Sequence, residues 1–478
     1  MKILKHTLLI ILAFLAVLAP IMSVIGIVLF TKPVYQNSFV GVLDEKFERL
    51  TSIEEDKVVV VGGSSVAFGL DSALMEEYVG MPVVNFGLYA AIGTKAMLDL
   101  SRPGIKEGDV VILAPELDRQ TLSLYFSSEN TLMALDGDYS MVRYIRGDNK
   151  LSLLGGAWSH ATKKLEYLLT EAPDPEGIYN SDSFNAYGDV KDGLRAENVM
   201  PLYYDENNII ELTSDILDPD FADYVNEYID YCNSRGATVY FTFCPINEMA
   251  LSDSTDTEAL SAFTGALKSK IDCEFISVID SYIMEAGYFY DTNYHLNDAG
   301  VIKRTKLLTE DILLALGKLK PVDIEVPAAP VLPEADVRYF GEDENSKYFV
   351  YEQMENGAMK IVGLTDLGKQ QTSLTVPLGA DGYKVTHIGD GAFAGASLTS
   401  LTVTDDTNLR KFLDGSFRDC AVTDVWIYYV FTSESEKLSP ASHFYGVTIH
   451  VPPDSSYSTD YDWGDSSGGY ELKTDALN

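Results

Sequence analysis

Two segments that lie far apart in the chain carry the residue types that activate a serine hydroxyl. The first places paired serines, Ser64 and Ser65, between glycines directly after an apolar run. The second contains His295, which follows the carboxylate of Asp291 by four residues and precedes a helix-capping Asn-Asp pair. A histidine oriented by an acid is the base that takes the proton from a nucleophilic serine. The sequence therefore predicts nucleophilic catalysis with His295 as general base.

Histidine scarcity supports this choice of base. The chain has six histidines, and only His160 and His295 lie between residues 57 and 316. His160 follows Trp158 closely and has no adjacent carboxylate, so we expect it to pack against its aromatic neighbour. The glycines around the serines alone would indicate only a turn, because such turns commonly follow strands.

Alternating apolar runs and helical segments must position both candidates. The runs are short and β-branched, which is typical of strands buried on both faces of a parallel sheet. They are 57–61, 82–86, 109–113, 237–243 and 275–279. The segments with helical spacing are 72–78, 94–100, 219–234 and 297–316. This alternation predicts an α/β sandwich with a mainly parallel sheet, and an excursion over 114–218 that shapes a ligand site at its carboxyl edge.

Three motifs in this order resemble the SGNH or GDSL hydrolase family, and the resemblance covers roughly 57–316, within a domain expected over 54–317. They are Gly63-Ser64-Ser65 with Gly69, Asn85-Phe86-Gly87, and His295-Leu296-Asn297 with Gly300. The resemblance implies a flavodoxin-like parallel-sheet sandwich. It also implies that Ser65 is the nucleophile, that His295 is the base, and that the amides of Ser65 and Gly87 form the oxyanion hole.

Two positions depart from the family pattern. Thr292 stands where the family has the orienting Asp, so we assign that role to Asp291. The family's Gly-x-Asn-Asp block after the third strand is replaced by a segment containing Glu116, and an ionised Glu116 would repel an oxyanion. Glu116 then has another task, such as substrate binding, or the hole uses two amides, with Asn85 or Asn247 as further candidates. A related membrane-anchored subgroup, which acts in O-acetylation and D-alanylation of surface polymers, has similarly loose third blocks.

The expected reaction is two-step acyl transfer through an acyl-Ser65 intermediate, ending on water (an esterase) or on a sugar hydroxyl (an O-acyltransferase). The expected substrate is an acylated carbohydrate or other ester, above all acetyl esters of cell-envelope or exported polysaccharide. No cofactor and no metal are expected. The tyrosines of the excursion either stack on sugar rings or pack against the sheet; they are Tyr179, Tyr187, Tyr203 and Tyr204.

The alternative to an enzyme is a catalytically retired SGNH-fold adhesion or scaffold protein that works through its leucine-rich repeats. A nucleotide-binding enzyme is a weaker third idea, because no phosphate-binding motif follows Gly62.

The N-terminal run Thr7–Phe30 has no charged residue in 24 positions, which is long enough to span a bilayer. We expect an uncleaved single-pass anchor over 7–30, with a cleaved signal peptide as the alternative. Lys2 and Lys5 place the tip, residues 1–6, in the cytoplasm, and everything after it outside the cell membrane. Residues 31–53 are interpreted as a stalk.

The C-terminal part contains an internal repeat after a proline-rich linker over 318–336. Gly389–Phe393 recurs 24 residues later as Leu413–Phe417, and apolar positions keep the same offset. The segment around 383–430 resembles the leucine-rich repeat of the bacterial surface type, within a region expected over 337–454. Such an array either binds a surface protein or glycan or serves as a spacer. Residues 455–478 are expected to be a loose acidic tail.

Charge and cysteine content exclude other classes. With 35 Lys and Arg against 72 Asp and Glu, the net charge of −37 excludes nucleic acid as a partner. The four cysteines show no metal-site or disulfide-framework spacing. Buried free thiols are favoured over a single bridge among Cys232, Cys244 and Cys273.

Overall fold

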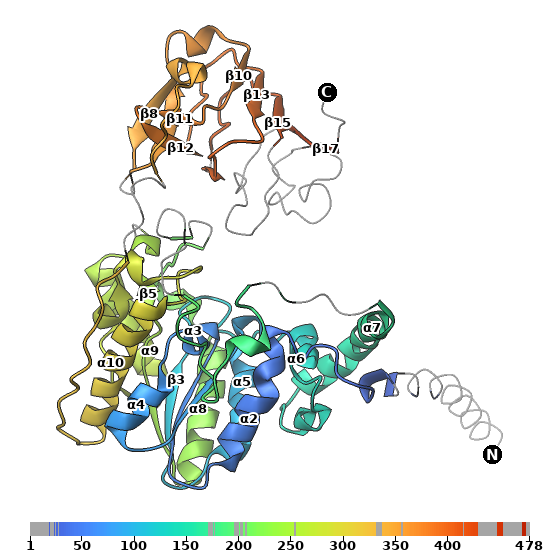
Figure 1. Cartoon of the computed structure of the whole chain (residues 1–478), viewed down its shortest axis with the longest axis vertical. Helices are drawn as coiled ribbons and strands as arrows, with labels where there is room; N and C mark the ends of the chain where they lie inside the picture. The colour runs from blue at the N-terminus through green and yellow to red at the C-terminus, as the bar shows by residue number, and fades with distance from the viewer. Residues whose placement is uncertain are drawn as a thin grey trace. The chain divides into compact units, whose positions relative to one another are not determined.

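The computed structural model divides the chain into two compact units (Figure 1). One comprises Met1–Val199 with Asn208–Pro330, and the other Met200–Asn207 with Val331–Asn478. The residues that the structure describes are 19, 23, 25–26, 28–170, 175, 177–195, 200, 204–205, 208–252, 255–330, 337–354, 357–413, 415–428, 447–452 and 471–474.

A five-stranded parallel sheet forms the centre of the first unit, in the order β2-β1-β3-β4-β6. The strands are β1 (Val58–Gly62), β2 (Val83–Gly87), β3 (Val110–Ala114), β4 (Thr238–Phe241) and β6 (Glu274–Phe275). The first three are buried along their whole length, as their unbroken β-branched sequences predict. The predicted α/β class with a parallel sheet is therefore confirmed. Among these five strands the order reverses at β1, as in flavodoxin-like doubly wound sheets.

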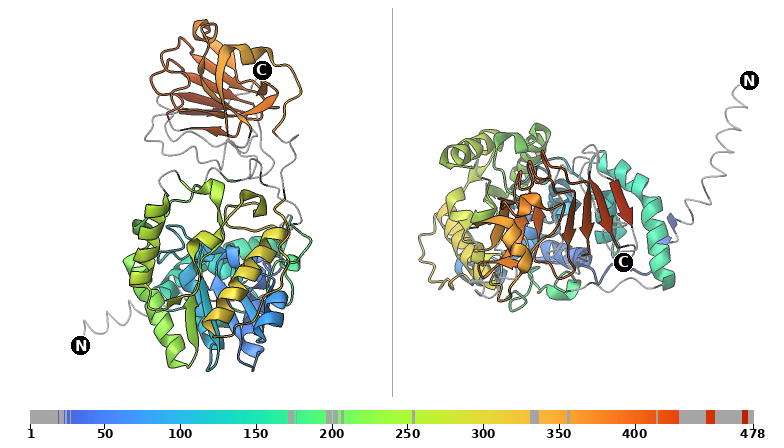
Figure 2. Two further views of the ribbon diagram at one scale, coloured as in Figure 1. Left: turned by 90° about the vertical axis from the view of Figure 1, so that its left-hand side faces the viewer. Right: turned by 90° about the horizontal axis from the view of Figure 1, so that it is seen from above.

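Helices cover both faces of this sheet (Figures 1 and 2). They are α4 (Ser72–Val79), α5 (Thr94–Ser101), α8 (Pro219–Ser234), α9 (Thr257–Lys270) and α10 (Asp298–Ala315). Val58 and Val60 pack with α4 and α10, whereas Val61 lies among side chains of α5 and α8. Side chains alternate between the two faces of a strand, so the valines of β1 contribute to the hydrophobic core on each side of the sheet. Asp71, Asp218 and Asn297 cap three of these helices.

The segment interpreted as a stalk belongs to the fold instead. Helix α2 (Leu43–Ser52) packs on the first unit with Leu43 and Leu50 fully buried. Lys46 is also buried and donates to the carbonyl oxygens of Asn85 (3.1 Å) and Gly188. Leucines at helical spacing were the sequence signal for this helix.

The proline-rich linker and the excursion also contain ordered structure. Val322 and Ile324 of the linker are buried against Leu313 of α10, so its first half packs on the first unit, and residues 331–336 lie outside the described residues. The excursion contains α6 (Ser128–Ala134), α7 (Asn149–Thr170) and short 3-10 turns. His160 on α7 does pack among aromatic rings, but these are Tyr35 and Tyr139 and not Trp158.

The second unit confirms the 24-residue repeat. Strands β13 (Ser400–Val403) and β15 (Asp424–Ile427) pair in parallel with every partner 24 residues apart. The rings of Phe393 and Phe417, also 24 residues apart, lie 5.5 Å from each other. The same sheet adds β10 (Ser373–Thr375) before them and β16 (Thr448–Val451) and β17 (Glu471–Thr474) after them.

Strand β17 corrects the expectation of a loose tail, because it pairs with β16 over four residues. The other tail residues lie outside the described part. A second sheet of this unit contains β8 (Phe349–Gln353), β9 (Met359–Leu364), β11 (Gly379–Ala380) and β12 (Tyr383–Ile388), with β14 (Lys411–Phe412) on β12. The apolar side chains of both sheets form one core.

The four cysteines are free thiols, and burial raises the pKa of Cys232 to about 12. Within the ranges that the structure describes, no helix combines the length and the apolarity needed to cross a membrane. Most of the run 7–30, and the tip 1–6, lie outside those ranges. The anchor therefore remains a prediction.

Candidate active site

A sharp turn after β1 presents the paired serines. Gly62 ends the strand, Gly63 caps the short helix α3 (Ser64–Ala67), and Ser64 is its first residue. A Cβ on Gly62 would lie 2.5 Å from the carbonyl oxygen of Ala114 on β3, and one on Gly63 would lie 2.9 Å from Glu116 Oε1. Gly62 is therefore required by the close approach of the β3 backbone, and a side chain at Gly63 would displace the Glu116 carboxylate.

The structure differs from the sequence prediction in which serine reaches the cavity. Ser64 lines a cavity at this edge, whereas Ser65 is fully buried and its Oγ has no hydrogen-bond partner. Arg304, buried on α10, donates to the carbonyl oxygen of Ser65 and holds the inner side of the turn. A Cβ on Gly69 would lie 2.2 Å from Nη1 of Arg304, which explains the glycine there. Because successive residues of a helical turn point in different directions, a one-residue difference decides which serine lines the cavity.

Glu116 binds the serine turn directly. The Ser65 amide donates to Glu116 Oε1 (2.6 Å), and the Ser64 hydroxyl donates to the same oxygen (3.2 Å). Burial raises the pKa of the Glu116 carboxyl above its ordinary value, against the opposing effects of the Ser65 amide and nearby His295. Glu116, which follows β3, thus lies directly beside the serine turn that follows β1.

The predicted oxyanion donors are already engaged in hydrogen bonds. The Ser65 amide is bonded to Glu116, and the Gly87 amide donates to Asn85 Oδ1 (3.0 Å). Asn85 Nδ2 donates to the Val66 carbonyl and to buried Asp189, so Asn85 stabilises the sheet edge and does not line the cavity. Asn247 caps a 3-10 turn by accepting from the Met249 amide, also away from the cavity lining.

His295 and Asp291 form the predicted pair. Nδ1 of His295 lies 2.8 Å from Asp291 Oδ1. The loop that joins them is closed like a hairpin, because the Tyr290 amide donates to the His295 carbonyl (2.9 Å). Thr292 accepts from the His295 amide (3.0 Å) and so shapes the loop instead of holding the imidazole. The assignment of the orienting acid to Asp291 agrees with this geometry.

Two residues that the sequence reasoning did not assign to catalysis complete the histidine's surroundings. The Tyr179 hydroxyl donates to Asp291 Oδ2 and lies 3.4 Å from His295 Nδ1. The Phe68 ring stacks on the imidazole, with 4.2 Å between centroids and 1° between planes. Phe68 directly follows α3, so the serine turn and the histidine are packed together. No motif in the sequence indicates that Phe68 stacks on His295, because a phenylalanine three residues after a serine pair has no specific meaning.

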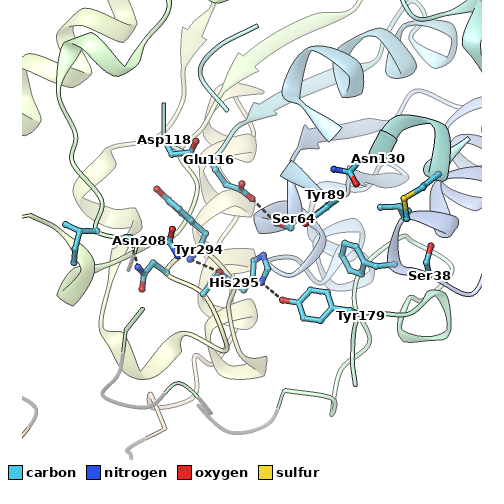
Figure 3. A pocket seen from close by; sticks show the side chains of 16 residues that line it. Ser38, Ser64, Tyr89, Glu116, Asp118, Asn130, Tyr179, Asn208, Tyr294 and His295 are labelled. Atoms are coloured by element: carbon cyan, nitrogen blue, oxygen red, sulfur yellow. Dashed lines mark hydrogen bonds between the residues drawn. The ribbon is translucent and has the colours of Figure 1, made fainter. Parts of the chain in front are cut away.

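The cavity that contains these groups has a volume of about 630 Å³ (Figure 3). Ser64, Glu116 and His295 lie together in it, with Tyr179 beside the imidazole. Asp118 also lines it, and its carboxylate accepts from the amides of Gln120 and Thr121. The remaining lining is mainly aromatic, apolar or amide; it includes Phe39, Tyr89, Asn130, Met133, Asn208 and Ile209. No lysine or arginine is among the described lining residues.

The arrangement can transfer a proton but is not aligned for attack as it stands. Among the described residues, no hydrogen bond joins His295 to Ser64 or Ser65. The Nδ1–Asp291 bond leaves Nε2 as the nitrogen that can exchange a proton with a hydroxyl in the cavity. Catalytic hydrogen bonds are often absent or long before substrate binds, so this geometry is compatible with a serine nucleophile.

The first unit is thus a doubly wound α/β protein with a serine–glutamate–histidine cavity at the carboxyl edge of its sheet, and the second contains a parallel sheet with a 24-residue repeat. Among solved structures, the chain is similar to a leucine-rich repeat protein from Bacteroides capillosus, at 16% sequence identity and a TM-score of 0.18. The match covers 27% of this chain and 98% of that one, and a likeness this low carries no argument. No family model and no curated protein matches the chain.

Proposed function

We propose that the first unit is a serine acyl-transfer enzyme of the SGNH type, with Ser64 as nucleophile, His295 as general base and Asp291 as the acid that orients it. One observation carries the proposal: an imidazole fixed by a carboxylate at 2.8 Å shares a cavity with the hydroxyl at the end of β1. The strand order and the order of the three motifs along the chain support it. Labelling of the full chain in detergent by a fluorophosphonate probe tests it, and a folded chain that stays unlabelled would contradict it.

The reaction follows from these positions. The Ser64 hydroxyl turns from Glu116 to His295, Nε2 accepts its proton, and Oγ attacks the ester carbonyl carbon. Collapse of the tetrahedral intermediate breaks the bond to the alkoxy oxygen, which leaves as an alcohol with the proton from His295. Water or a sugar hydroxyl then attacks acyl-Ser64, with His295 again accepting the proton. Esterase and O-acyltransferase activity differ only in this last acceptor.

The proposal gives Glu116 a regulatory role in the first step. An oxyanion needs hydrogen-bond donors, and the Ser65 amide is the donor nearest the turn. The ionised carboxylate both accepts from that amide and repels developing negative charge. A protonated Glu116 carries no such charge, although its carbonyl oxygen can still accept from the amide, and burial raises the pKa of this carboxyl and so extends the neutral form to higher pH.

We therefore expect Glu116→Gln to increase acyl transfer roughly tenfold at about pH 8, because the neutral amide removes the negative charge that would repel the oxyanion. In the wild type, activity should fall as pH rises through the Glu116 pKa, because ionisation introduces the repulsive charge. The glutamine variant should lack this fall. Hydrolysis rates of an aryl acetate across pH measure both effects.

Asp118→Asn is the matched control, because Asp118 lines the same cavity but bonds only its own turn. It should retain the fall seen in the wild type, moved to lower pH, because the Asp118 charge helps to raise the pKa of Glu116. Equal loss of rate at every pH in Glu116→Gln would instead mean that the carboxylate itself takes part in the reaction.

The substrate proposal rests on the cavity lining and on the predicted location. Aromatic rings such as Tyr89 and Tyr179 can stack on sugar rings, and the acidic lining disfavours anionic groups. We propose neutral acetyl esters of cell-envelope or exported polysaccharide as substrates. In this proposal the run 7–30 anchors the chain in the cell membrane with both units outside. The second unit is a leucine-rich repeat domain of the bacterial surface type that binds a surface protein or glycan.

A retired hydrolase that works through its repeats is the second candidate. The observation that favours it is that both predicted oxyanion amides already have acceptors within the molecule, Glu116 and Asn85. It predicts no serine labelling in any Glu116 variant, whereas the enzyme proposal predicts labelling that Glu116→Gln increases.

A further inference from the structure

Helix α7 carries a stripe of exposed apolar side chains along one face. Leu151, Leu154, Trp158, Leu165 and Leu169 are all exposed, with Trp158 at 52% and Leu169 at 78%. At 100° per residue these five positions fall within about 60° of arc. The opposite face is buried through Leu153, His160 and Lys164. We call the five residues the α7 stripe.

The α7 stripe lies beside the end of the N-terminal apolar run. Ile25 and Val28 are buried against Ala161 of α7, with Leu29 and Ala157 partly buried in the same cluster. Around the helix, Ala157 and Ala161 directly adjoin Leu154 and Trp158 of the stripe. The apolar surface is therefore continuous from the run to the stripe.

Polar contacts fix this junction in place. Lys164 donates to the Leu29 carbonyl (3.0 Å) and to Asp136 Oδ1 (2.6 Å), with its side chain and that of Asp136 buried. Asp136 Oδ2 also accepts from the amides of Val34 (2.6 Å) and Tyr35 (3.1 Å). The segment where the run enters the folded unit is thus tied to α7 and to Asp136, which follows α6. The end of the run and the α7 stripe are therefore exposed to the same medium.

We propose that α7 lies in the surface of the lipid bilayer, with the α7 stripe in contact with acyl chains. The inference rests on the anchor in the proposed function, because a run of 24 uncharged residues is long enough to cross a bilayer and its last turn touches α7. A helix that gathers leucines and a tryptophan on one exposed face is the kind that binds a membrane interface. A water-exposed stripe of this size would be unusual for a soluble surface.

This docking would fix the cavity relative to the membrane. Helix α6 packs on α7 closely enough that a Cβ on Gly156 would lie 2.8 Å from Ser128 Oγ. Asn130 and Met133 of α6 line the cavity. A membrane-bound α7 therefore supports one wall of the site, which suits an ester substrate presented close to the bilayer.

Quenching of Trp158 fluorescence by brominated lipid tests the proposal. The full chain with Trp426→Phe and Trp463→Phe keeps Trp158 as its single tryptophan. It is reconstituted into phosphatidylcholine vesicles with brominated acyl chains; a zwitterionic lipid avoids repulsion of the acidic chain. We expect a blue-shifted emission and a roughly twofold loss of intensity against unbrominated vesicles, because an interfacial helix buries its apolar face at the acyl boundary.

The matched control adds Trp158→Phe and Leu314→Trp, which moves the reporter to an exposed position on α10, at the far side of the sheet from α7 (Figure 1). The tryptophan at position 314 should emit as a water-exposed residue, and brominated lipid should not quench it. An inserted chain whose Trp158 is unquenched and water-exposed overturns the proposal. Shielded but unquenched Trp158 in a chain that cross-links as a dimer also overturns it and assigns the stripe to a second copy.

Failure of the chain to insert into vesicles overturns the anchor and the lipid contact together. Fluorophosphonate labelling of the same sample separates that result from failure of the enzyme proposal, because labelling does not depend on the bilayer.

Discussion

Replacement of Ser64 by alanine is expected to abolish labelling by a fluorophosphonate probe, with a loss of roughly 10⁴-fold or more in labelling rate. Ser64 provides the hydroxyl that lines the cavity with His295. Loss of a nucleophile removes the covalent step itself, so no other group replaces it. The rate of covalent labelling, followed by intact-protein mass, measures this directly and needs no knowledge of the natural substrate.

Ser65→Ala is the matched control, because it removes the neighbouring hydroxyl of the same turn. That hydroxyl is fully buried and has no hydrogen-bond partner, so its removal should leave labelling within about tenfold of the wild type. Thermal unfolding of both variants checks that the turn is intact. The reverse result is loss of labelling in Ser65→Ala with labelling retained in Ser64→Ala. It would make Ser65 the nucleophile, as the family motif implies, and contradict the proposal.

Most of the first unit's fold could be predicted from its sequence. The run of four β-branched valines before Gly62 is typical of a fully buried strand, and β1 starts within one residue of the prediction. Helix α8 has the predicted bounds because Asp218 and Pro219 form a strong start signal. The predicted run 275–279 fails beyond Phe275, since β6 lies at the sheet edge and pairs over only two residues.

The site was predictable where its contacts are local. Asp291 and His295 are four residues apart, and a closed loop suffices to bring them together. The choice between Ser64 and Ser65 depends on the exact direction of a helical turn, which motif spacing does not encode. Tyr179 reaches Asp291 across 112 residues, and no pattern in the sequence indicates that contact. Tertiary packing alone determines it.

Asp291→Asn is the second change with a large expected effect. In the wild type, Asp291 accepts from His295 Nδ1 and so keeps Nε2 free to take the Ser64 proton. An asparagine can present its N–H to Nδ1, which places the imidazole proton on Nε2 and blocks the base. The same substitution in a serine protease triad costs about 10⁴ in kcat, and we expect a loss of roughly 10³–10⁴ here. Aryl acetate hydrolysis should show the loss in kcat with little change in KM.

Tyr179→Phe distinguishes this tautomer effect from general disturbance of the loop. It removes the donor to the other oxygen of Asp291 but leaves the Nδ1–Asp291 bond. Its loss should stay at or below about a hundredfold, because a single hydrogen bond to a charged group contributes about 1.5–3 kcal/mol and about 1.4 kcal/mol corresponds to tenfold in rate. If Asp291→Asn and Tyr179→Phe reduce kcat equally, the carboxylate holds the loop together and does not set the tautomer. If Asp291→Asn stays within tenfold of the wild type, His295 works without an orienting acid and the proposed triad fails.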